Sequence, residues 1–307
     1  MHIQSPSVAV LLAAYNGARW IEEQLDSIRA QKNINVSIFI SVDISSDETQ
    51  RICDRYAQKY SNVHILPPAD RFGGAAKNFY RLIKDIDFTP YAYVAFSDQD
   101  DIWYPEKLLN ATTVLSGGEF DAYSSNVIAF WPDGRRALVD KAQQQVEWDY
   151  LFEAAGPGCT YVLCRPLADA FKCTLIRYWD KAQNISLHDW YCYAFARSNG
   201  FRWFIDPTPG MDYRQHNSNQ LGANNGILSH SKRLKKIFEG WWGSQVLLID
   251  NLTGMPSSLL KKEKGSKRLV FISLVLKAYK CRRRRKDQLL FVFACLITAV
   301  SKSAKTI

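Results

Sequence analysis

Long apolar runs are absent from this sequence of 307 residues. Two apolar runs in its C-terminal part, residues 269–276 and 289–300, are both shorter than the roughly 20 residues that a helix needs to span a bilayer. The first residues also lack a positively charged segment followed by an apolar core, so we expect no signal peptide. We therefore predict a chain that does not cross a membrane.

Cysteine pairs of the C-x-x-C type are absent as well. The seven cysteines are odd in number and scattered along the chain, which argues against a disulfide framework. We therefore expect reduced thiols and a cytoplasmic protein.

Glycine-rich phosphate loops are missing too. Gly73-Gly74 and Gly156-Pro157-Gly158 match neither a phosphate loop nor a dinucleotide fingerprint, and we interpret them as turns near a site. Residues 13–17 contain no basic side chain that could hold a triphosphate. This absence counts against a nucleotidyltransferase that makes nucleotide sugars, which is one alternative for an enzyme of this kind.

Positive charge is present in excess but is unevenly placed. The net charge is +9, and residues 228–307 contain eighteen Lys or Arg against four Asp or Glu, so this tail carries +14 and the rest about −5. A basic tail on a mildly acidic body predicts contact between the tail and an anionic surface, either a membrane or a nucleic acid.

The first hundred residues alternate apolar runs rich in β-branched residues with helical patterns. We predict strands at residues 8–14, 36–42, 63–66 and 91–96. Helices are expected at residues 17–30, after a capping box formed by Ser45 and Glu48, and at 78–86. This alternation indicates an α/β fold with a mostly parallel sheet, whose ligands bind beyond the carboxyl ends of the strands.

The second half is less regular. Helices are predicted at residues 105–115, 167–178 and 189–197, and strands at 120–131, 159–164 and 201–205. From residue 227 the sequence becomes helical and basic, with helices expected at 232–249, 269–276, 282–286 and 289–300. We therefore divide the chain into a catalytic domain, residues 1–226, and a C-terminal region, residues 227–307.

An acidic motif follows the strand at residues 91–96. Asp98, Asp100 and Asp101 place three carboxylates within four residues, and such a cluster at the end of a buried strand calls for a neutralising cation. Oxygen ligands of this kind suit Mg²⁺ or Mn²⁺, which also bind diphosphate oxygens. The alternative is a solvated acidic loop in which Asp101 caps the next helix.

Several segments resemble, in order and spacing, the family 2 glycosyltransferases of GT-A fold, and in particular their bacterial rhamnosyltransferase-like branch. The resemblance covers residues 6–225. It rests on residues 8–17 (VAVLLAAYNG), 42–49 (VDISSDET), 71–79 (RFGG to NF), 97–103 (SDQDDIW), 188–191 (HDWY) and 213–219 (YRQHNSN). It implies an enzyme with a flanked, mostly parallel sheet that uses a nucleotide-sugar donor.

The resemblance also implies a donor site. Asp43 would accept the imide N–H of a uracil or thymine base, and Ala14 and Tyr15 would line the base pocket. The family usually has Asp-Asp-Gly-Ser where this chain has Val42-Asp43-Ile44-Ser45, which leaves the base and ribose contacts open. Asp98 would contact the ribose. A dTDP-linked deoxysugar is suggested, and UDP-hexoses stay open.

The metal would be bound by Asp100 and, through the family's late histidine, by His216. Asp101 would either orient the metal site or cap the next helix. Arg214 would pair with the donor phosphates, although a surface arginine is nearly as well supported.

The acceptor side is implied by His188-Asp189-Trp190. Asp189 would be the catalytic base that takes the proton of an acceptor hydroxyl in an inverting single displacement, with capping of a helix as the alternative. Trp103 and Trp190 would stack on sugar or acceptor, or pack in the core.

The acceptor would be a lipid-linked or polysaccharide substrate of bacterial surface glycan synthesis. We expect the basic tail, including the run Arg282–Lys286, to hold the protein on the anionic inner face of the cell membrane. Packing of the tail on the body or on a second subunit is the alternative. A non-catalytic protein that binds nucleic acid or membrane is disfavoured, since it has no need of Asp98, Asp100 and Asp189, and no nucleic acid is expected.

Overall fold

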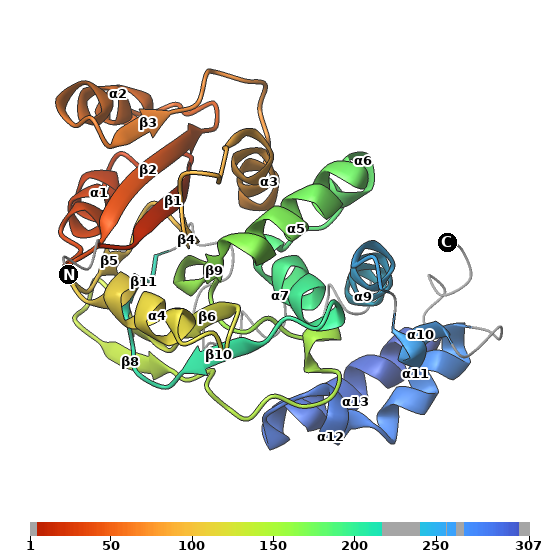
Figure 1. Ribbon diagram of the computed structural model, residues 1–307. Helices are drawn as coiled ribbons and strands as arrows, with labels where there is room; N and C mark the ends of the chain where they lie inside the picture. Colours follow the sequence, from red (N-terminus) through yellow and green to blue (C-terminus); the bar gives the residue numbers. More distant parts are fainter. Residues whose placement is uncertain (1–4, 217–239, 256, 262–266, 301–307) are drawn as a thin grey trace.

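The computed structural model describes residues 5–216, 240–255, 257–261 and 267–300. A seven-stranded sheet with helices on both faces forms its centre (Figure 1). The strand order is β10-β6-β9-β4-β1-β2-β3. These strands are β1 (Ser7–Ala14), β2 (Asn35–Val42), β3 (Val63–Ile65), β4 (Tyr93–Ser97), β6 (Ala122–Ser125), β9 (Val162–Cys164) and β10 (Trp203–Asp206). Neighbours pair in parallel except β9, which is antiparallel to β4 and β6, so the predicted mostly parallel α/β fold is confirmed.

Alternating side chains of β1 divide the core into two layers. Val8, Val10 and Leu12 belong to one hydrophobic cluster and Leu11 to the other, as expected for a strand that is buried on both faces. The first cluster receives α1 (Ile21–Arg29), α2 (Thr49–Lys59) and α4 (Lys107–Ser116). The second receives α3 (Ala75–Asp85), α5 (Arg165–Arg177) and α7 (His188–Ser198), and α6 (Trp179–Ala182) extends α5.

A second, four-stranded sheet has the order β5-β11-β7-β8. It contains β5 (Ile102–Trp103), β7 (Val127–Phe130), β8 (Arg136–Val139) and β11 (Met211–Arg214). The prediction of one strand over residues 120–131 is wrong, because the chain leaves the first sheet after β6 and enters the second at β7. Asn126 fixes this change of sheet: its buried side chain accepts from the N–H groups of Lys141 and Ala142 and donates to the Pro207 carbonyl.

The loop after β8 contains two short 3₁₀ helices, η1 (Asp149–Leu151) and η2 (Gly158–Thr160). The C-terminal region packs beside α7 and this loop (Figure 1). Its described helices are α9 (Trp241–Leu252), α10 (Ser258–Lys261), α11 (Lys267–Val275), α12 (Ala278–Cys281) and α13 (Arg285–Val300). Phe271, Leu274 and Phe291 of these helices belong to the same hydrophobic cluster as α7, so the tail shares the core of the body.

Two local predictions were wrong. Ser45 and Glu48 form no capping box, because the Ser45 hydroxyl donates to the Asp43 carbonyl and Asp47 receives the Thr49 N–H. The run Arg282–Lys286 is no separate helix, since α13 begins at Arg285. The boundary drawn at residues 226 and 227, and residues 217–219 of the late motif, lie outside the described residues.

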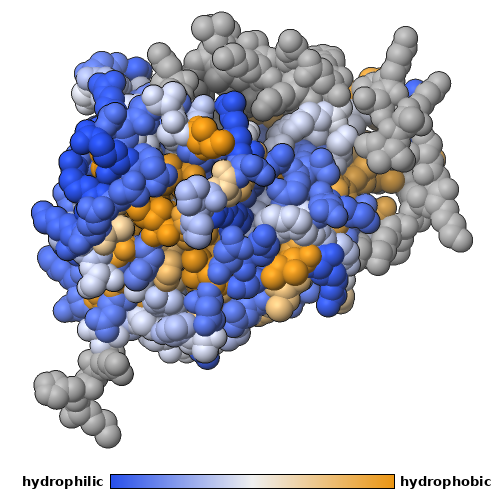
Figure 2. All heavy atoms as spheres, turned by 90° about the horizontal axis from the view of Figure 1, so that it is seen from above, coloured by the Kyte–Doolittle hydropathy of each residue, from blue (hydrophilic) through white to orange (hydrophobic). Residues whose placement is uncertain are grey.

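None of the helices described is long and apolar enough to cross a membrane. Seen from above, the surface is mostly hydrophilic, with apolar side chains in groups between hydrophilic ones (Figure 2).

Candidate active site

The carboxyl ends of β1 and β4 meet at the centre of the sheet. The Gln99 side chain joins them: its Oε1 accepts from the Tyr15 N–H at 2.7 Å, and its Nε2 donates to the Tyr15 carbonyl at 2.8 Å. A Cβ atom on Gly17 would lie 2.2 Å from Gln99 Oε1, so only glycine leaves room for this contact. The acidic motif is thereby held against the loop after β1.

Asp43 lies buried at the end of β2, beside this junction. Its Oδ1 accepts from the N–H groups of Ile44 and Phe72, and its Oδ2 accepts from the N–H of Gly73 at 3.1 Å. A carboxylate offers about four acceptor positions, so Oδ2 retains one for a ligand. Tyr15 is 43% exposed at the same place, while Ala14 is buried.

The three carboxylates of the acidic motif have different surroundings. Burial raises the pKa of Asp98 to about 7, and the negative charges of Asp100 and Asp189 add to this shift. Burial also raises the pKa of Asp101 well above its usual range, and the negative charges of Asp100 and Asp98 act in the same direction. Its Oδ1 accepts from the Arg214 N–H, and its buried Oδ2 has no hydrogen-bond partner among the described residues.

Asp100 faces the late histidine. Its Oδ2 lies 2.6 Å from Nε2 of His216, which the end of the β11 segment supplies. The His216 ring stacks on Trp20, with ring centroids 4.1 Å apart and an interplanar angle of 20°. Trp20 immediately precedes α1, so three distant segments fix the position of this imidazole.

Arg214 is held by neighbouring groups. Its Nε donates to the Asp100 carbonyl at 2.7 Å, its Nη2 contacts the Glu23 carboxylate, and its guanidinium lies over the Phe130 ring. These contacts connect β11 to the acidic motif and to α1. They fix the orientation of the Arg214 side chain against the acidic motif.

Asp100 and His216 could together hold a divalent cation. Octahedral Mg²⁺ has bonds of about 2.1 Å, which places neighbouring ligand atoms about 3 Å apart, and the Asp100 and His216 ligand atoms need to move little to reach this spacing. A second group, Asp98, Asp101 and Cys159, has ligand atoms within 4.8 Å of one another. The second group includes a thiol, a soft ligand that suits Mg²⁺ and Mn²⁺ poorly, so we favour the first set.

A buried lysine lies behind the acidic motif. Lys107 Nζ sits 3.6 Å from the centroid of the Trp103 ring and has no hydrogen-bond partner among the described residues. Burial lowers the pKa of Lys107 to about 7, while Cys159 and Asp101 act in the opposite direction. Trp103, expected to stack on sugar or acceptor, is 2% exposed and packs against this lysine.

Asp189 lies at the start of α7, close enough to Asp98 for its charge to raise the pKa of Asp98. Burial raises the pKa of Asp189 to about 6. Its Oδ1 accepts from the Trp190 N–H at 2.8 Å, and no hydrogen bond to Oδ2 is found within the described part of the chain. Asp189 therefore lies at the start of a helix, as predicted, and its carboxylate is more basic than usual.

The neighbours of Asp189 are core residues. His188 stacks on Phe79 with ring centroids 3.9 Å apart, and burial lowers the pKa of His188 to about 3, so its ring is neutral. Trp190 is 4% exposed and donates its ring N–H to the Tyr150 carbonyl. Both aromatic rings therefore support the helix start from within the core.

Sequence reasoning missed several residues of this site, namely Trp20, Gln99, Lys107 and Cys159. Gln99 lies inside the recognised motif, and its polar side chain next to a buried strand was an available signal. Trp20 and Lys107 carry no such signal, because their proximity to the motif arises from the packing of α1 and α4.

Comparisons with known proteins show what this chain is similar to. The model of the family described as "Glycosyl transferase family 2" matches residues 9–158. A dTDP-rhamnosyl transferase of Shigella flexneri, RfbG, is 46% identical over 287 residues, which are 93% of this chain and 99% of the relative. A putative glycosyltransferase of Bacillus subtilis, EpsH, is 29% identical over 46% of this chain and 40% of its own length.

Two solved structures share the fold. TarS 1–349 of S. aureus has a TM-score of 0.54 and 16% identity, covering 95% of this chain and 88% of that one. The mannosyltransferase PcManGT of Pyrobaculum calidifontis, solved with GDP-Man and Mn²⁺, has a TM-score of 0.53 and 16% identity, covering 96% and 87%. These likenesses concern the arrangement of the chain.

Proposed function

The chain belongs to glycosyltransferase family 2, and from this premise we propose that it transfers a dTDP-linked deoxysugar, in particular rhamnose, to an acceptor hydroxyl in bacterial surface glycan synthesis. The observation that carries this proposal is the 46% identity to a dTDP-rhamnosyl transferase over nearly its entire length. Family membership sets aside the nucleotidyltransferase and the non-catalytic alternatives.

The donor would lie along the ends of β2, β1 and β4. Asp43 has an acceptor position left for the imide N–H of thymine or uracil, and the exposed Tyr15 ring lies beside it. Asp98 would then meet the ribose and Asp100 the metal, in the order in which the strands are arranged. Arg214 would hold the acidic motif in place through its contacts with the Asp100 carbonyl and Glu23.

Mg²⁺ or Mn²⁺, held by Asp100 and His216, would stabilise the diphosphate as it leaves. The chain's own residues supply the rest of the reaction. Asp189 accepts the acceptor's proton while the hydroxyl oxygen attacks the anomeric carbon on the face opposite the diphosphate. The C–O bond to the acceptor forms as the bond to the diphosphate breaks, which inverts the anomeric configuration. Asp101, whose side chain accepts from the Arg214 N–H, and the buried Lys107 are assigned no step of the reaction.

The lipid-linked or polysaccharide acceptor would be reached at an anionic membrane surface. Large apolar side chains are exposed in the C-terminal region, among them Leu276 directly after α11 and Leu289 and Phe293 on α13, at 83%, 67% and 61%. Arg268, Arg285 and Lys286 are exposed nearby in sequence, and each basic residue near an anionic leaflet contributes about 1 kcal/mol. Arg282, Arg283 and Arg284 instead contact the body, so we assign the membrane contact to the exposed residues of α11 and α13.

A panel of donors tests the proposed function. The purified protein is incubated with Mn²⁺ and dTDP-rhamnose, UDP-glucose, UDP-GlcNAc or GDP-mannose, and release of the nucleoside diphosphate is measured with and without EDTA. We expect EDTA-sensitive release to be fastest from dTDP-rhamnose. Preferential release from GDP-mannose would overturn the assigned base pocket, since guanine presents a different pattern of donors to Asp43.

A further inference from the structure

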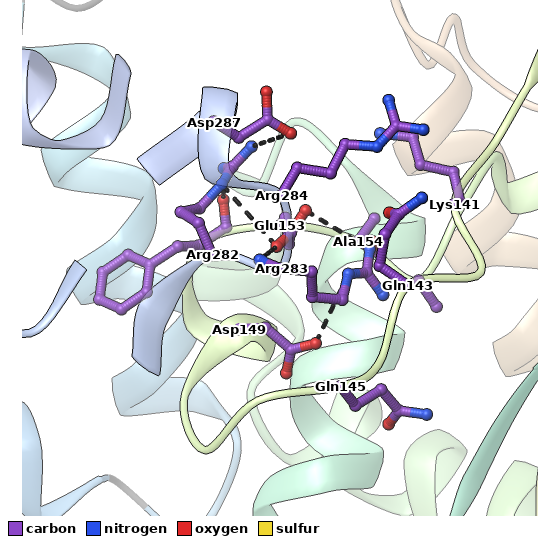
Figure 3. A network of polar contacts seen from close by, with 12 residues as sticks. Lys141, Gln143, Gln145, Asp149, Glu153, Ala154, Arg282, Arg283, Arg284 and Asp287 are labelled. Atoms are coloured by element: carbon purple, nitrogen blue, oxygen red, sulfur yellow. Dashed lines mark hydrogen bonds and ion pairs between the residues drawn. The ribbon is translucent and has the colours of Figure 1, made fainter. Parts of the chain in front are cut away.

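Arg282, Arg283 and Arg284, which directly precede α13, form hydrogen bonds and ion pairs with the loop between β8 and β9 (Figure 3). Arg283 is the most enclosed member, with a fully buried side chain. Its N–H donates to Glu153 Oε1 at 2.8 Å, its Nη2 donates to the Ala154 carbonyl at 2.6 Å, and its Nε lies 3.7 Å from Asp149 Oδ2. The C-terminal region is thus joined to the loop by an interior ion pair.

Asp149 is also held by the helix that carries Asp189. The Tyr193 hydroxyl donates to Asp149 Oδ2 at 2.9 Å, and Arg197 Nη1 donates to Asp149 Oδ1 at 3.1 Å. Both residues belong to α7, one and two turns after Asp189. Asp149 therefore bonds on one side to α7 and on the other to Arg283.

The same loop ends against Asp189 itself. It runs from Glu153 through Ala154 to Gly158, where a Cβ atom would lie 2.8 Å from His188 Nε2 and 3.0 Å from Asp189 Cβ. Gly158 follows Ala154, the last residue that Arg283 contacts, by only four positions. A shift of the loop at Ala154 would therefore be transmitted to the start of α7.

The charges in this network depend on one another. Burial raises the pKa of Glu153, but Arg282 and Arg283 outweigh it and hold that pKa below its usual range. Burial also raises the pKa of Asp149, against the opposing effect of Arg197 and Arg283. Removal of the arginine alone would leave two buried carboxylates undercompensated, which in proteins is strongly destabilising.

We infer that Arg283 is a positioning residue for the transfer reaction: through Glu153, Ala154 and Asp149 it fixes the loop and α7 that orient the Asp189 carboxylate. This inference rests on the proposed role of Asp189 as the base. It makes the basic tail part of the catalytic apparatus, in addition to any contact with a membrane.

The test uses the full chain with a charge-balanced variant. In Arg283→Met/Glu153→Gln a cation and an anion are removed together, which keeps the Asp149–Arg197 pair and limits destabilisation. We expect kcat for transfer to fall about tenfold or more, because small misplacements of catalytic groups are costly. The dissociation constant for dTDP with Mn²⁺, measured by calorimetry, and the KM for the donor should stay at the parental value.

Arg177→Met is the matched control, since Arg177 is an exposed arginine at the end of α5 and has no role in the proposed site or membrane contact. Its kcat should equal that of the parent. Arg283→Lys keeps the charge without the planar fork, and should recover part of kcat. If the double variant unfolds, the same measurements on Arg283→Lys decide the question.

Two outcomes would overturn the inference. One is parental kcat in every Arg283 variant. The other is an equal loss of donor affinity and kcat, which would mean a general structural role. A parallel Asp189→Asn variant separates this test from that of the proposed function, because failure of the base assignment appears as retained transfer in Asp189→Asn itself.

Discussion

His216 Nε2 and Asp100 Oδ2 lie 2.6 Å apart, although 116 positions separate the two residues in the sequence. Asp100 follows β4 in the first sheet, and His216 follows β11 in the second. The pair therefore forms only when the two sheets have both assembled. Trp20 completes it by stacking on the imidazole ring.

Replacing Trp20 should weaken metal binding without removing a ligand. In Trp20→Leu the His216 ring loses its stacking partner, and we expect the affinity for Mn²⁺, measured by calorimetry with dTDP present, to fall about tenfold, as for other supporting residues around metal sites. Trp20→Phe keeps an aromatic ring and should retain most of the affinity. Equal affinities for all three proteins would show that stacking does not orient the histidine.

Asp100→Asn should abolish metal-dependent donor binding, because an amide oxygen carries no negative charge to offset the cation. The measurement is calorimetry with dTDP, with and without Mn²⁺. Asp133→Asn, which changes an exposed acid on the turn between β7 and β8, is the matched control and should bind like the parent. Unchanged affinity in Asp100→Asn would exclude Asp100 as a ligand.

Asp189→Asn should reduce transfer by about a hundredfold or more while sparing donor binding, since general-base catalysis contributes this much. Burial raises the pKa of Asp189 to about 6, and the deprotonated form is the base. The rate of transfer by the parent should therefore decline as the pH falls below about 6 and level off above it. The Asn variant should lack this decline. Near-parental turnover in the variant would require a different base.

Gly158→Ala should destabilise the protein and slow transfer. The new Cβ would lie 2.8 Å from the His188 ring, which cannot move freely because it stacks on Phe79. Overpacking of this kind costs about 1–3 kcal/mol in the free energy of unfolding, measurable by urea titration. The control is Gly117→Ala, whose Cβ would meet its nearest atom at 3.4 Å. Equal stability of both variants would mean that the loop gives way at little cost.

Membrane contact can be tested without disturbing the core. The triple variant Leu276→Ser/Leu289→Ser/Phe293→Ser changes exposed side chains only, so each should alter stability by at most about 0.5 kcal/mol. We expect it to cosediment less with anionic phospholipid vesicles than the parent, with unchanged release of nucleoside diphosphate. Ile176→Ser, which changes an exposed apolar residue of α5, should cosediment like the parent. No binding of the parent to anionic vesicles would contradict the proposal.

The sequence predicted the central sheet because its signals are local. Apolar β-branched runs such as residues 8–14 and 36–42 are long and bounded by polar turns, and β1 and β2 occupy nearly these ranges. The second sheet was missed, since β5 has two residues and β11 four, too few for a period to be seen. Asn126, the single residue between β6 and β7, is neither a glycine nor a proline, so the sequence did not indicate a break there.

Part of the candidate site could likewise be predicted from the sequence, and part could not. The motif around Asp98 and the late histidine were recognisable, and the structure places Asp100 beside His216. Burial was not predictable: the sequence left Trp103 and Trp190 open as stacking residues, and both lie in the core. The sequence also did not reveal that Arg282, Arg283 and Arg284 form ion pairs with the body. Their partners, such as Asp140 and Glu153, lie more than a hundred residues away in the sequence.

The interior ion pair of Arg283 bears on how such enzymes can be recombined. In a chimaera that takes only the stretch from β8 to η2 from a relative, Arg283 of this chain would face the relative's residues in place of Asp149 and Glu153. The two stretches joined by this pair, residues 140–158 and 277–300, should therefore be exchanged as one unit. Among the described residues, no hydrogen bond or ion pair joins the chain up to β4 to the C-terminal helices, so an exchange of that part leaves the contacts of Arg283 in place.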